Sequence, residues 1–218
     1  MKKKSVITVI LALVLMFSLS HYAVEAEEDQ DRETDRRFYT EELLEDFEET
    51  VFTGEHITFI RTVDQEADLQ IREEYPAPVQ DSTKYLGVKV NGRFGDVFKI
   101  KPPEDLTIEG HARSIELWVY GKNFSGELSL LLQDAEDQVH RLVFGRLNFL
   151  GWRKMRVMIT PHVRQQHRYL HQDENMRILE FQYRPQNRER ATRWHYFYID
   201  HITTTVRERY RDRQSDDW

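Results

Sequence analysis

The stretch Ser114-Ile115-Glu116-Leu117-Trp118-Val119-Tyr120 decides the fold class, because its side chains alternate in character from one residue to the next. Successive side chains of an extended strand point to opposite faces, so a period of two residues indicates a β-strand. Here one face carries Ile115, Leu117 and Val119, and the other carries an indole and a phenol ring. The pattern predicts a strand with one aliphatic face and one aromatic face.

Later stretches repeat this alternation and are separated by turn-like segments; they are residues 128–132, 155–159 and 179–183. A last strand is predicted over 194–204 and is apolar on both faces. Upstream, Asn91-Gly92 is the strongest short hairpin signal in the chain. It predicts that a strand over 85–90 turns back into a strand over 96–100. Repeated short alternating runs of this kind indicate an all-β, antiparallel sandwich.

One short helix is expected, with Thr160 as its N-cap, Pro161 at the first helical position and a polar stretch toward Leu170. This segment holds His162, His167 and His171, and the last two are one helical turn apart, which would let both bind one metal ion. No Cys and no His-Glu-x-x-His frame accompanies them, so a solvated helix face is the favoured interpretation.

The first residues have the pattern of an export signal. Lysines at positions 2–4 precede an apolar run over 6–19, and Ala23-Val24-Glu25-Ala26 follows. A basic start, an apolar middle and small residues before the cut are typical of a signal peptide, which we predict over 1–26. The alternative is a short uncleaved anchor, although the run is shorter than the ~20 apolar residues of a membrane span. No membrane span is expected after cleavage.

The rest of the chain is expected to form one domain. Residues 27–41 are polar and acidic and predict a flexible lead-in, residues 42–206 hold the strand patterns, and residues 207–218 form a charged tail. The chain has no Cys, so its core must depend on packing, to which an aromatic content of 12% contributes.

Composition and motifs argue against several functions. The formal net charge of −7 offers no basic field for nucleic acid. There is no Cys, no Gly-x-Ser-x-Gly and no glycine-rich loop before a helix, so no catalytic residue is assigned and no enzyme is expected. The carboxylates of Asp134, Glu136 and Asp137 are interpreted as turn residues.

A structural calcium ion is the metal hypothesis that the sequence supports best. Asp46 and Glu48 lie at the start of the predicted domain, and Asp200 lies on its last strand. The first and last strands of a sandwich are often neighbours, so these oxygen ligands could meet around a hard cation. The alternative is that these carboxylates cap turns or pair with Arg.

Aromatic residues allow two interpretations. Five of them on the predicted strands are Trp118, Tyr120, Trp194, Tyr196 and Tyr198. They could line one sheet face and stack on sugar rings, which would make the protein a periplasmic glycan-binding module. They could equally be core or interface residues, where aromatic side chains are enriched.

The chain resembles the flagellar filament outer layer (sheath) proteins of spirochaetes. Residues 114–124, SIELWVYGKNF, are similar to the family pattern S-I-x-x-W-V-Y-G-x-N-F. Residues 147–153, LNFLGWR, are similar to L-N-F-x-G-W-K, with Arg153 in place of the commoner Lys. Shorter similarities occur at residues 46–48, 196–200 and 216–218.

The resemblance implies a fold and a function. The fold would be a jelly-roll like that of carbohydrate-binding modules and galactose-binding domains. The function would be a periplasmic outer layer around a core of flagellin, made with other sheath proteins and copies of itself, that influences filament stiffness, curvature and motility. Arg146 and Arg153 lie near the turn over 145–151 and, with the five aromatic residues, are expected to contact the filament or a partner.

Overall fold

The computed structural model describes residues 39–60, 66–166, 175–186 and 193–207. The chain divides into two compact units, Met1–Thr40 and Glu41–Trp218, and the second holds the fold. The described elements are a 3₁₀ turn η1 (Gly54–His56) and the strands β1 (Tyr39–Glu45), β2 (Ile57–Ile60), β3 (Glu66–Arg72), β4 (Tyr85–Gly92), β5 (Val97–Ile100), β6 (Leu106–Ile108), β7 (Ala112–Lys122), β8 (Gly126–Gln133), β9 (Val139–Arg146), β10 (Leu150–Met158), β11 (Met176–Pro185) and β12 (Arg193–Arg207).

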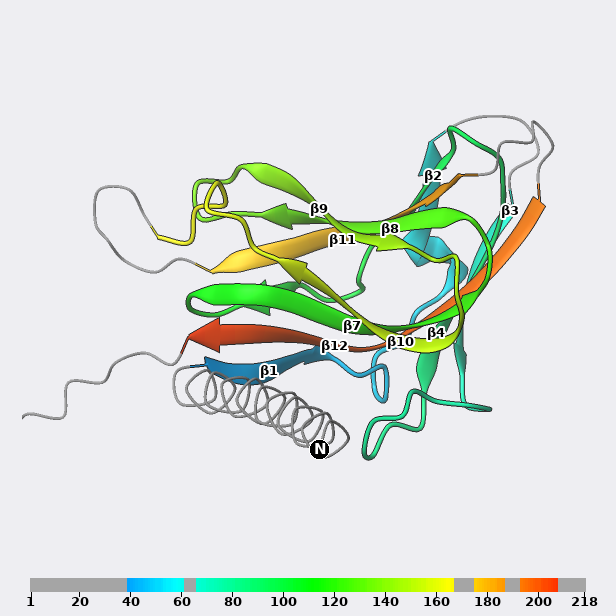
Figure 1. Cartoon of the computed structure of the whole chain (residues 1–218), viewed down its shortest axis with the longest axis horizontal. Coiled ribbons are helices and arrows are strands. Elements are labelled where there is room, and N and C mark those ends of the chain that lie inside the picture. Colours follow the sequence, from blue (N-terminus) through cyan, green and yellow to red (C-terminus); the bar gives the residue numbers. More distant parts are fainter. Residues whose placement is uncertain (1–38, 61–65, 167–174, 187–192, 208–218) are drawn as a thin grey trace, which may run out of the picture. The chain divides into compact units, whose positions relative to one another are not determined.

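The strands form two sheets that lie face to face (Figure 1). Sheet A has the order β10-β7-β12-β4-β3, and β1 also pairs with β12. Sheet B has the order β2-β5-β11-β8-β9, and β6 also pairs with β11. The pairs whose register is determined are antiparallel. The structure confirms an all-β, antiparallel jelly-roll sandwich.

Alternation along the strands places the core between the sheets. Ile115, Leu117 and Val119 of β7 are fully buried, and so are Leu128 and Leu130 of β8 in the opposite sheet. Burying an aliphatic side chain of this size stabilises a fold by roughly 1.5–3 kcal/mol. The period-two pattern of residues 114–120 therefore identifies the face of sheet A that packs against sheet B.

The expected hairpin at Asn91-Gly92 is wrong. β4 lies in sheet A and β5 in sheet B, so the chain crosses between the layers instead of turning back beside itself. A turn over 93–96 makes the crossing, with the Arg93 amide donating to Asp96 Oδ2 at 2.8 Å. Gly92 is required there for another reason, since a Cβ would lie 2.5 Å from the Phe98 ring.

The expected helix is also absent from its described beginning, residues 160–166. Val163 donates to the Thr160 carbonyl in a turn, and its side chain is buried. Gln165 then bonds to both backbone groups of Ala112, accepting at 2.7 Å and donating at 2.9 Å. These tertiary contacts replace the helix that Thr160 and Pro161 predicted. The rest of the segment, with His167 and His171, lies outside the described residues.

β9 was not predicted, because its alternation is weak. Only Leu142 of this strand is buried, and Val139, Arg141 and Val143 are exposed. β9 is an edge strand of sheet B, where one neighbour is missing and burial is low. In the parts of the chain that the structure describes, no helix is long and apolar enough to cross a membrane.

Candidate binding cleft

Three rings lie in register across neighbouring strands on the outer face of sheet A. Trp152 of β10 pairs with Tyr120 of β7, and Tyr120 pairs with Tyr198 of β12. The aliphatic neighbours of Tyr120 point into the core, so its own ring and those beside it point outward. The strand register therefore builds an aromatic row from residues far apart in the chain.

Tyr85 of β4 joins this row and packs against its two ends. Its ring centroid lies 5.6 Å from that of Trp152 and 5.2 Å from that of Tyr198. The Trp152 indole is edge-on to both Tyr85 and Tyr120, at interplanar angles of 86° and 81°. Edge-to-face and tilted contacts at these distances are the favourable arrangements for aromatic pairs, so the four rings support one another.

The row ends at Gly87 of β4, which is the partner of Tyr198 in the sheet. Because Gly87 has no side chain, Arg72 of β3 crosses the space above it, and a Cβ on Gly87 would lie 2.9 Å from the Arg72 side chain. The Arg72 guanidinium lies 5.9 Å from the centre of the Tyr198 ring and pairs with Glu74 at 3.0 Å.

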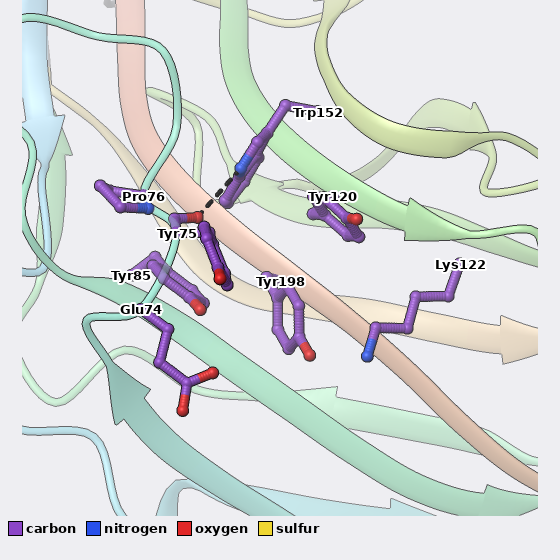
Figure 2. Close-up of a pocket in the computed structure, with 8 residues that line it drawn as sticks. All are labelled: Glu74, Tyr75, Pro76, Tyr85, Tyr120, Lys122, Trp152 and Tyr198. Atoms are coloured by element: carbon purple, nitrogen blue, oxygen red, sulfur yellow. Dashed lines mark hydrogen bonds between the residues drawn. The ribbon is translucent and has the colours of Figure 1, made fainter.

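The segment after β3 forms one wall of a cleft over these rings. The Trp152 indole Nε1 donates a hydrogen bond of 3.1 Å to the Tyr75 carbonyl oxygen, which holds that segment beside the ring row. The cleft has a volume of about 710 Å³. Figure 2 shows its lining, which is Glu74, Tyr75, Pro76, Tyr85, Tyr120, Lys122, Trp152 and Tyr198.

Cations lie along the same face of sheet A. The Lys122 ammonium is 5.0 Å from the centre of the Tyr198 ring and 5.6 Å from that of Tyr196. Further along β12, the Lys89 ammonium lies 4.2 Å from the Trp194 ring, and Trp194 stacks on Tyr196. Aromatic rings attract cations electrostatically, so this face presents rings and positive charge together.

The five aromatic residues selected from the sequence all lie on this face of sheet A, but they do not all line the cleft. Tyr120 and Tyr198 line the cleft, whereas Trp118, Trp194 and Tyr196 lie outside its lining. Sequence reasoning did not assign Tyr85 or Trp152 to any site. Trp152 stands in the family-like stretch 147–153, which was the signal that could have marked it.

The family-like stretches of the sequence meet at this cleft. Stretch 114–124 supplies Tyr120, stretch 147–153 supplies Trp152, and stretch 196–200 supplies Tyr198. The first two also lock together, because Asn123 donates to the Phe149 carbonyl at 2.7 Å. Gly121 permits this contact, since a Cβ there would lie 2.5 Å from that same oxygen.

The two arginines expected at an interface are both exposed. Arg153 lies on β10, and its guanidinium is 4.3 Å from the centre of the Phe149 ring. Arg146 ends β9, where it pairs with Glu127 of β8 in the sheet. Neither residue lines the cleft.

The three carboxylates of the expected calcium site act as hydrogen-bond acceptors. Glu48 accepts from the Thr83 amide and hydroxyl at 2.6 Å each and from the Lys84 amide at 2.8 Å. Although burial opposes it, these bonds hold the pKa of the Glu48 carboxyl below its ordinary value. Asp46 Oδ1 accepts from the Glu48 amide at 3.1 Å.

Asp200 is fully buried under the connection between β3 and β4. Its Oδ2 accepts from the Ala77 amide at 3.1 Å and from the Ser82 hydroxyl at 2.8 Å, while its Oδ1 is buried without a hydrogen-bond partner among the described residues. Burial raises the pKa of Asp200, against these hydrogen bonds. Glu48 and Asp200 thus both fix the 77–84 segment. In the described ranges, no three His, Cys, Asp or Glu side chains gather closely enough to hold a metal ion.

One histidine is buried near the far end of the aromatic face. His195 of β12 has no exposed surface, and its Nδ1 lies 2.7 Å from the Tyr183 hydroxyl. Burial, together with the charge of Arg193, lowers the pKa of His195 to about 4. The imidazole is therefore neutral at physiological pH and serves as a hydrogen-bonding part of the core.

Fold and cleft together define an antiparallel β-sandwich protein with an aromatic cleft on one sheet. Within that class, the chain belongs to the flagellar filament outer layer protein FlaA family, whose family model matches residues 15–208. A flagellar filament outer layer-like protein of Brachyspira hyodysenteriae is 32% identical over 102 residues, which are 44% of this chain. The match spans 47% of that relative, about half its length.

Several solved structures with a similar fold are carbohydrate-binding modules. A family 11 module of a Clostridium thermocellum cellulase has a TM-score of 0.48 at 10% identity, covering 79% of this chain and 98% of the module. A xylan-binding domain from Paenibacillus barcinonensis has a TM-score of 0.39 at 9% identity, covering 76% and 94%. These similarities are distant and concern the fold alone. They do not transfer the ligands of those modules to this chain.

Proposed function

We propose that this protein is a periplasmic coat subunit that forms part of the outer layer around a flagellin core filament. The observation that carries the proposal is the family match over residues 15–208, which includes every described strand of the sandwich. The signal pattern over residues 1–26 supports export to the periplasm. The coat would act by binding and not by catalysis, and would change the stiffness and curvature of the filament and thereby motility.

The outer surface of the sandwich supports an assembly role. Aromatic side chains lie on the exposed face of sheet A, beside Lys89 and Lys122, and aromatic residues are enriched at protein interfaces. Apolar side chains are also exposed elsewhere, as with Leu150 at 78% and Val139 at 52% exposure. A coat would depend on many weak contacts repeated along the polymer, where avidity replaces the affinity of one contact.

We assign contact with the core filament or a neighbouring sheath protein to Arg146 and Arg153, together with the aromatic residues of the sheet A face. Both arginines are exposed; Arg146 directly precedes the 147–149 connection, and Arg153 lies on β10 shortly after it. An exposed guanidinium forms bidentate bonds with carboxylates of a partner, which suits it to recognition. Neighbouring copies of the protein would bury further parts of the same surface.

The direct test is the composition of purified periplasmic flagella. Quantitative mass spectrometry of washed filaments should find this protein at a fixed ratio to flagellin. Deletion of its gene should leave filaments assembled but altered in curvature and stiffness, as measured by electron microscopy, with reduced swimming. Absence from washed filaments, or unchanged filament shape and motility after deletion, would overturn the proposal.

The assigned contact residues are tested by charge reversal. Arg146→Glu and Arg153→Glu should each lower the amount of protein that cosediments with filaments. Arg177→Glu is the matched control, because Arg177 is also exposed but lies on β11 and pairs with Asp105 at 3.3 Å. Equal losses for the control and for the two test variants would place the contact elsewhere.

A further inference from the structure

We propose that the aromatic cleft on sheet A binds pyranose rings of an oligosaccharide chain. The site is the cleft of about 710 Å³ built by Tyr85, Tyr120, Trp152 and Tyr198 under the 74–76 segment. This inference rests on the geometry of the cleft. It goes beyond the coat function and does not depend on it.

The side chains that line the cleft favour a sugar over an apolar partner as its ligand. The lining contains tyrosines, one tryptophan, Pro76 and two charged residues, and none of its side chains is that of Leu, Ile, Val or Met. An apolar helix or lipid chain is normally received by flexible aliphatic side chains. Rings with polar tips instead match a ligand that has an apolar flat face and hydroxyl groups around its edge. A pyranose ring has that shape.

Polar groups are available for the edge of such a ring. Within the described part of the chain, the hydroxyls of Tyr120 and Tyr198 have no hydrogen-bond partner, and Lys122 forms no ion pair. Figure 2 shows the Lys122 ammonium near Tyr198 on one side of the cleft and the Glu74 carboxylate on another. Hydroxyl, ammonium and carboxylate groups can donate to and accept from sugar hydroxyls, which fixes the orientation of a ligand.

The rings are already held in place before a ligand arrives. Tyr85 is 2% exposed, and its ring packs on Trp152 and Tyr198. The indole N–H of Trp152 is bonded to the Tyr75 carbonyl, and the same connection is held again where Ala77 donates to Asp200. A site whose side chains are fixed in advance loses little conformational entropy on binding, which raises affinity.

The size of the cleft suits more than one sugar unit. Small-molecule sites usually measure ~300–1,000 Å³, and this cleft falls within that range. The aromatic face also continues along β12 from Tyr198 to Tyr196 and Trp194. A short oligosaccharide would therefore cover the cleft and extend toward these rings.

The test is direct binding of the purified, folded chain to soluble oligosaccharides. Tryptophan fluorescence and calorimetry would be used with a panel of cellotetraose, tetra-N-acetylchitotetraose and tetragalacturonate. We expect at least one of them to bind and to change Trp152 fluorescence. If no member of the panel binds at millimolar concentration, the proposal fails.

Variants locate the binding on the cleft. Tyr120→Ala and Tyr198→Ala should each weaken binding by about tenfold, because each removes a stacking ring. Tyr198→Phe keeps the ring and should lose less affinity than Tyr198→Ala. Trp118→Ala is the matched control, since this ring lies on β7 outside the cleft lining. Thermal unfolding checks that each variant is folded, and equal affinity of all four variants to wild type would overturn the assignment.

A second binding experiment distinguishes between the possible sources of the sugar. Filament binding would be compared before and after enzymatic deglycosylation of purified flagella. Loss of binding after deglycosylation, matched by Tyr120→Ala, assigns the sugar to the filament, whereas soluble binding alone assigns it to a free or cell-wall glycan. Filament binding that needs Tyr120 but survives deglycosylation would mean that the cleft holds a protein partner. That result would overturn the sugar proposal and leave the coat function intact.

Discussion

The indole N–H of Trp152 donates a 3.1 Å hydrogen bond to the carbonyl oxygen of Tyr75. This bond joins an edge strand of sheet A to the connection between β3 and β4, two segments that are far apart in the sequence. The same indole is edge-on to the rings of Tyr85 and Tyr120. Trp152 therefore holds the 74–76 segment that forms the wall of the cleft and packs against the rings that form its floor. This makes Trp152 the most informative position for mutation.

Replacing Trp152 with Phe keeps an aromatic ring and removes the donor. We expect Trp152→Phe to lower the free energy of unfolding by about 1 kcal/mol, the usual net value of one hydrogen bond. Amide hydrogen exchange should become faster over residues 73–78, because the wall loses this attachment. Trp118→Phe is the control and should leave exchange in that segment unchanged. Unaltered exchange in Trp152→Phe would contradict the role assigned to the bond.

A buried carboxylate joins strands of sheet A. Glu116 of β7 is only 2% exposed at its side chain and pairs with Lys154 at 2.7 Å and with Arg156 at 2.5 Å, both on β10. Although burial opposes it, these cations hold the pKa of Glu116 below its ordinary value. Lys154 also pairs with Glu41 at 2.9 Å.

We expect Glu116→Ala to destabilise the fold by about 2–3 kcal/mol, because two cations lose a buried partner. The cations are themselves partly exposed and can regain water, which keeps the loss below the ~3–5 kcal/mol typical of fully buried pairs. Glu127→Ala removes a more exposed pair with Arg141 and should cost less than about 1 kcal/mol. Chemical denaturation measures both, and equal costs would show that burial of Glu116 adds nothing.

The buried His195 predicts a pH dependence of stability. Its pKa is about 4 in the folded state, while an unfolded chain has the ordinary value near ~6.5. Between these values the unfolded chain takes up a proton that the folded chain does not, so stability is full above pH ~6.5 and falls as the pH drops toward ~4. The whole effect is about 3 kcal/mol.

Urea denaturation at several pH values would measure this slope. His195→Gln removes the titrating group and keeps a side chain that can bond to the Tyr183 hydroxyl, so its unfolding free energy should depend less on pH in that window. A slope in His195→Gln as steep as that of the wild type would mean that other groups cause it.

The described residues Asp46, Glu48 and Asp200 do not form a metal-binding group in the structure, so calcium binding by them stays an untested prediction. The buried Oδ1 of Asp200, which has no partner among the described residues, is the atom that a bound cation would satisfy. We expect millimolar Ca²⁺ to raise the thermal midpoint of the wild type and to leave that of Asp200→Asn unchanged. In EDTA, Asp200→Asn should be no less stable than the wild type, since it removes a buried charge. No rise with Ca²⁺ in the wild type would end the hypothesis.

Much of the fold could be predicted from local pattern. The alternation at residues 115–119 and 128–132 identified strands and their buried faces, because burial on one side of a sheet forces a period of two. Local pattern failed where a distant contact decided the outcome. Asn91-Gly92 has the chemistry of a hairpin, but pairing of β4 with β3 and β12 leaves β5 in the other sheet. Thr160-Pro161 has the chemistry of a helix start, but Gln165 bonds to Ala112 instead.

By itself, the sequence determined an all-β sandwich, the faces of its main strands and the family, because these follow from neighbouring residues and from two contiguous stretches. Only the tertiary structure decided the cleft. Tyr85, Tyr120, Trp152 and Tyr198 lie on four different strands, and antiparallel register, which no local pattern specifies, brings their rings within 5.6 Å of their neighbours. A shift of register by one residue would turn these rings toward the opposite face of the sheet.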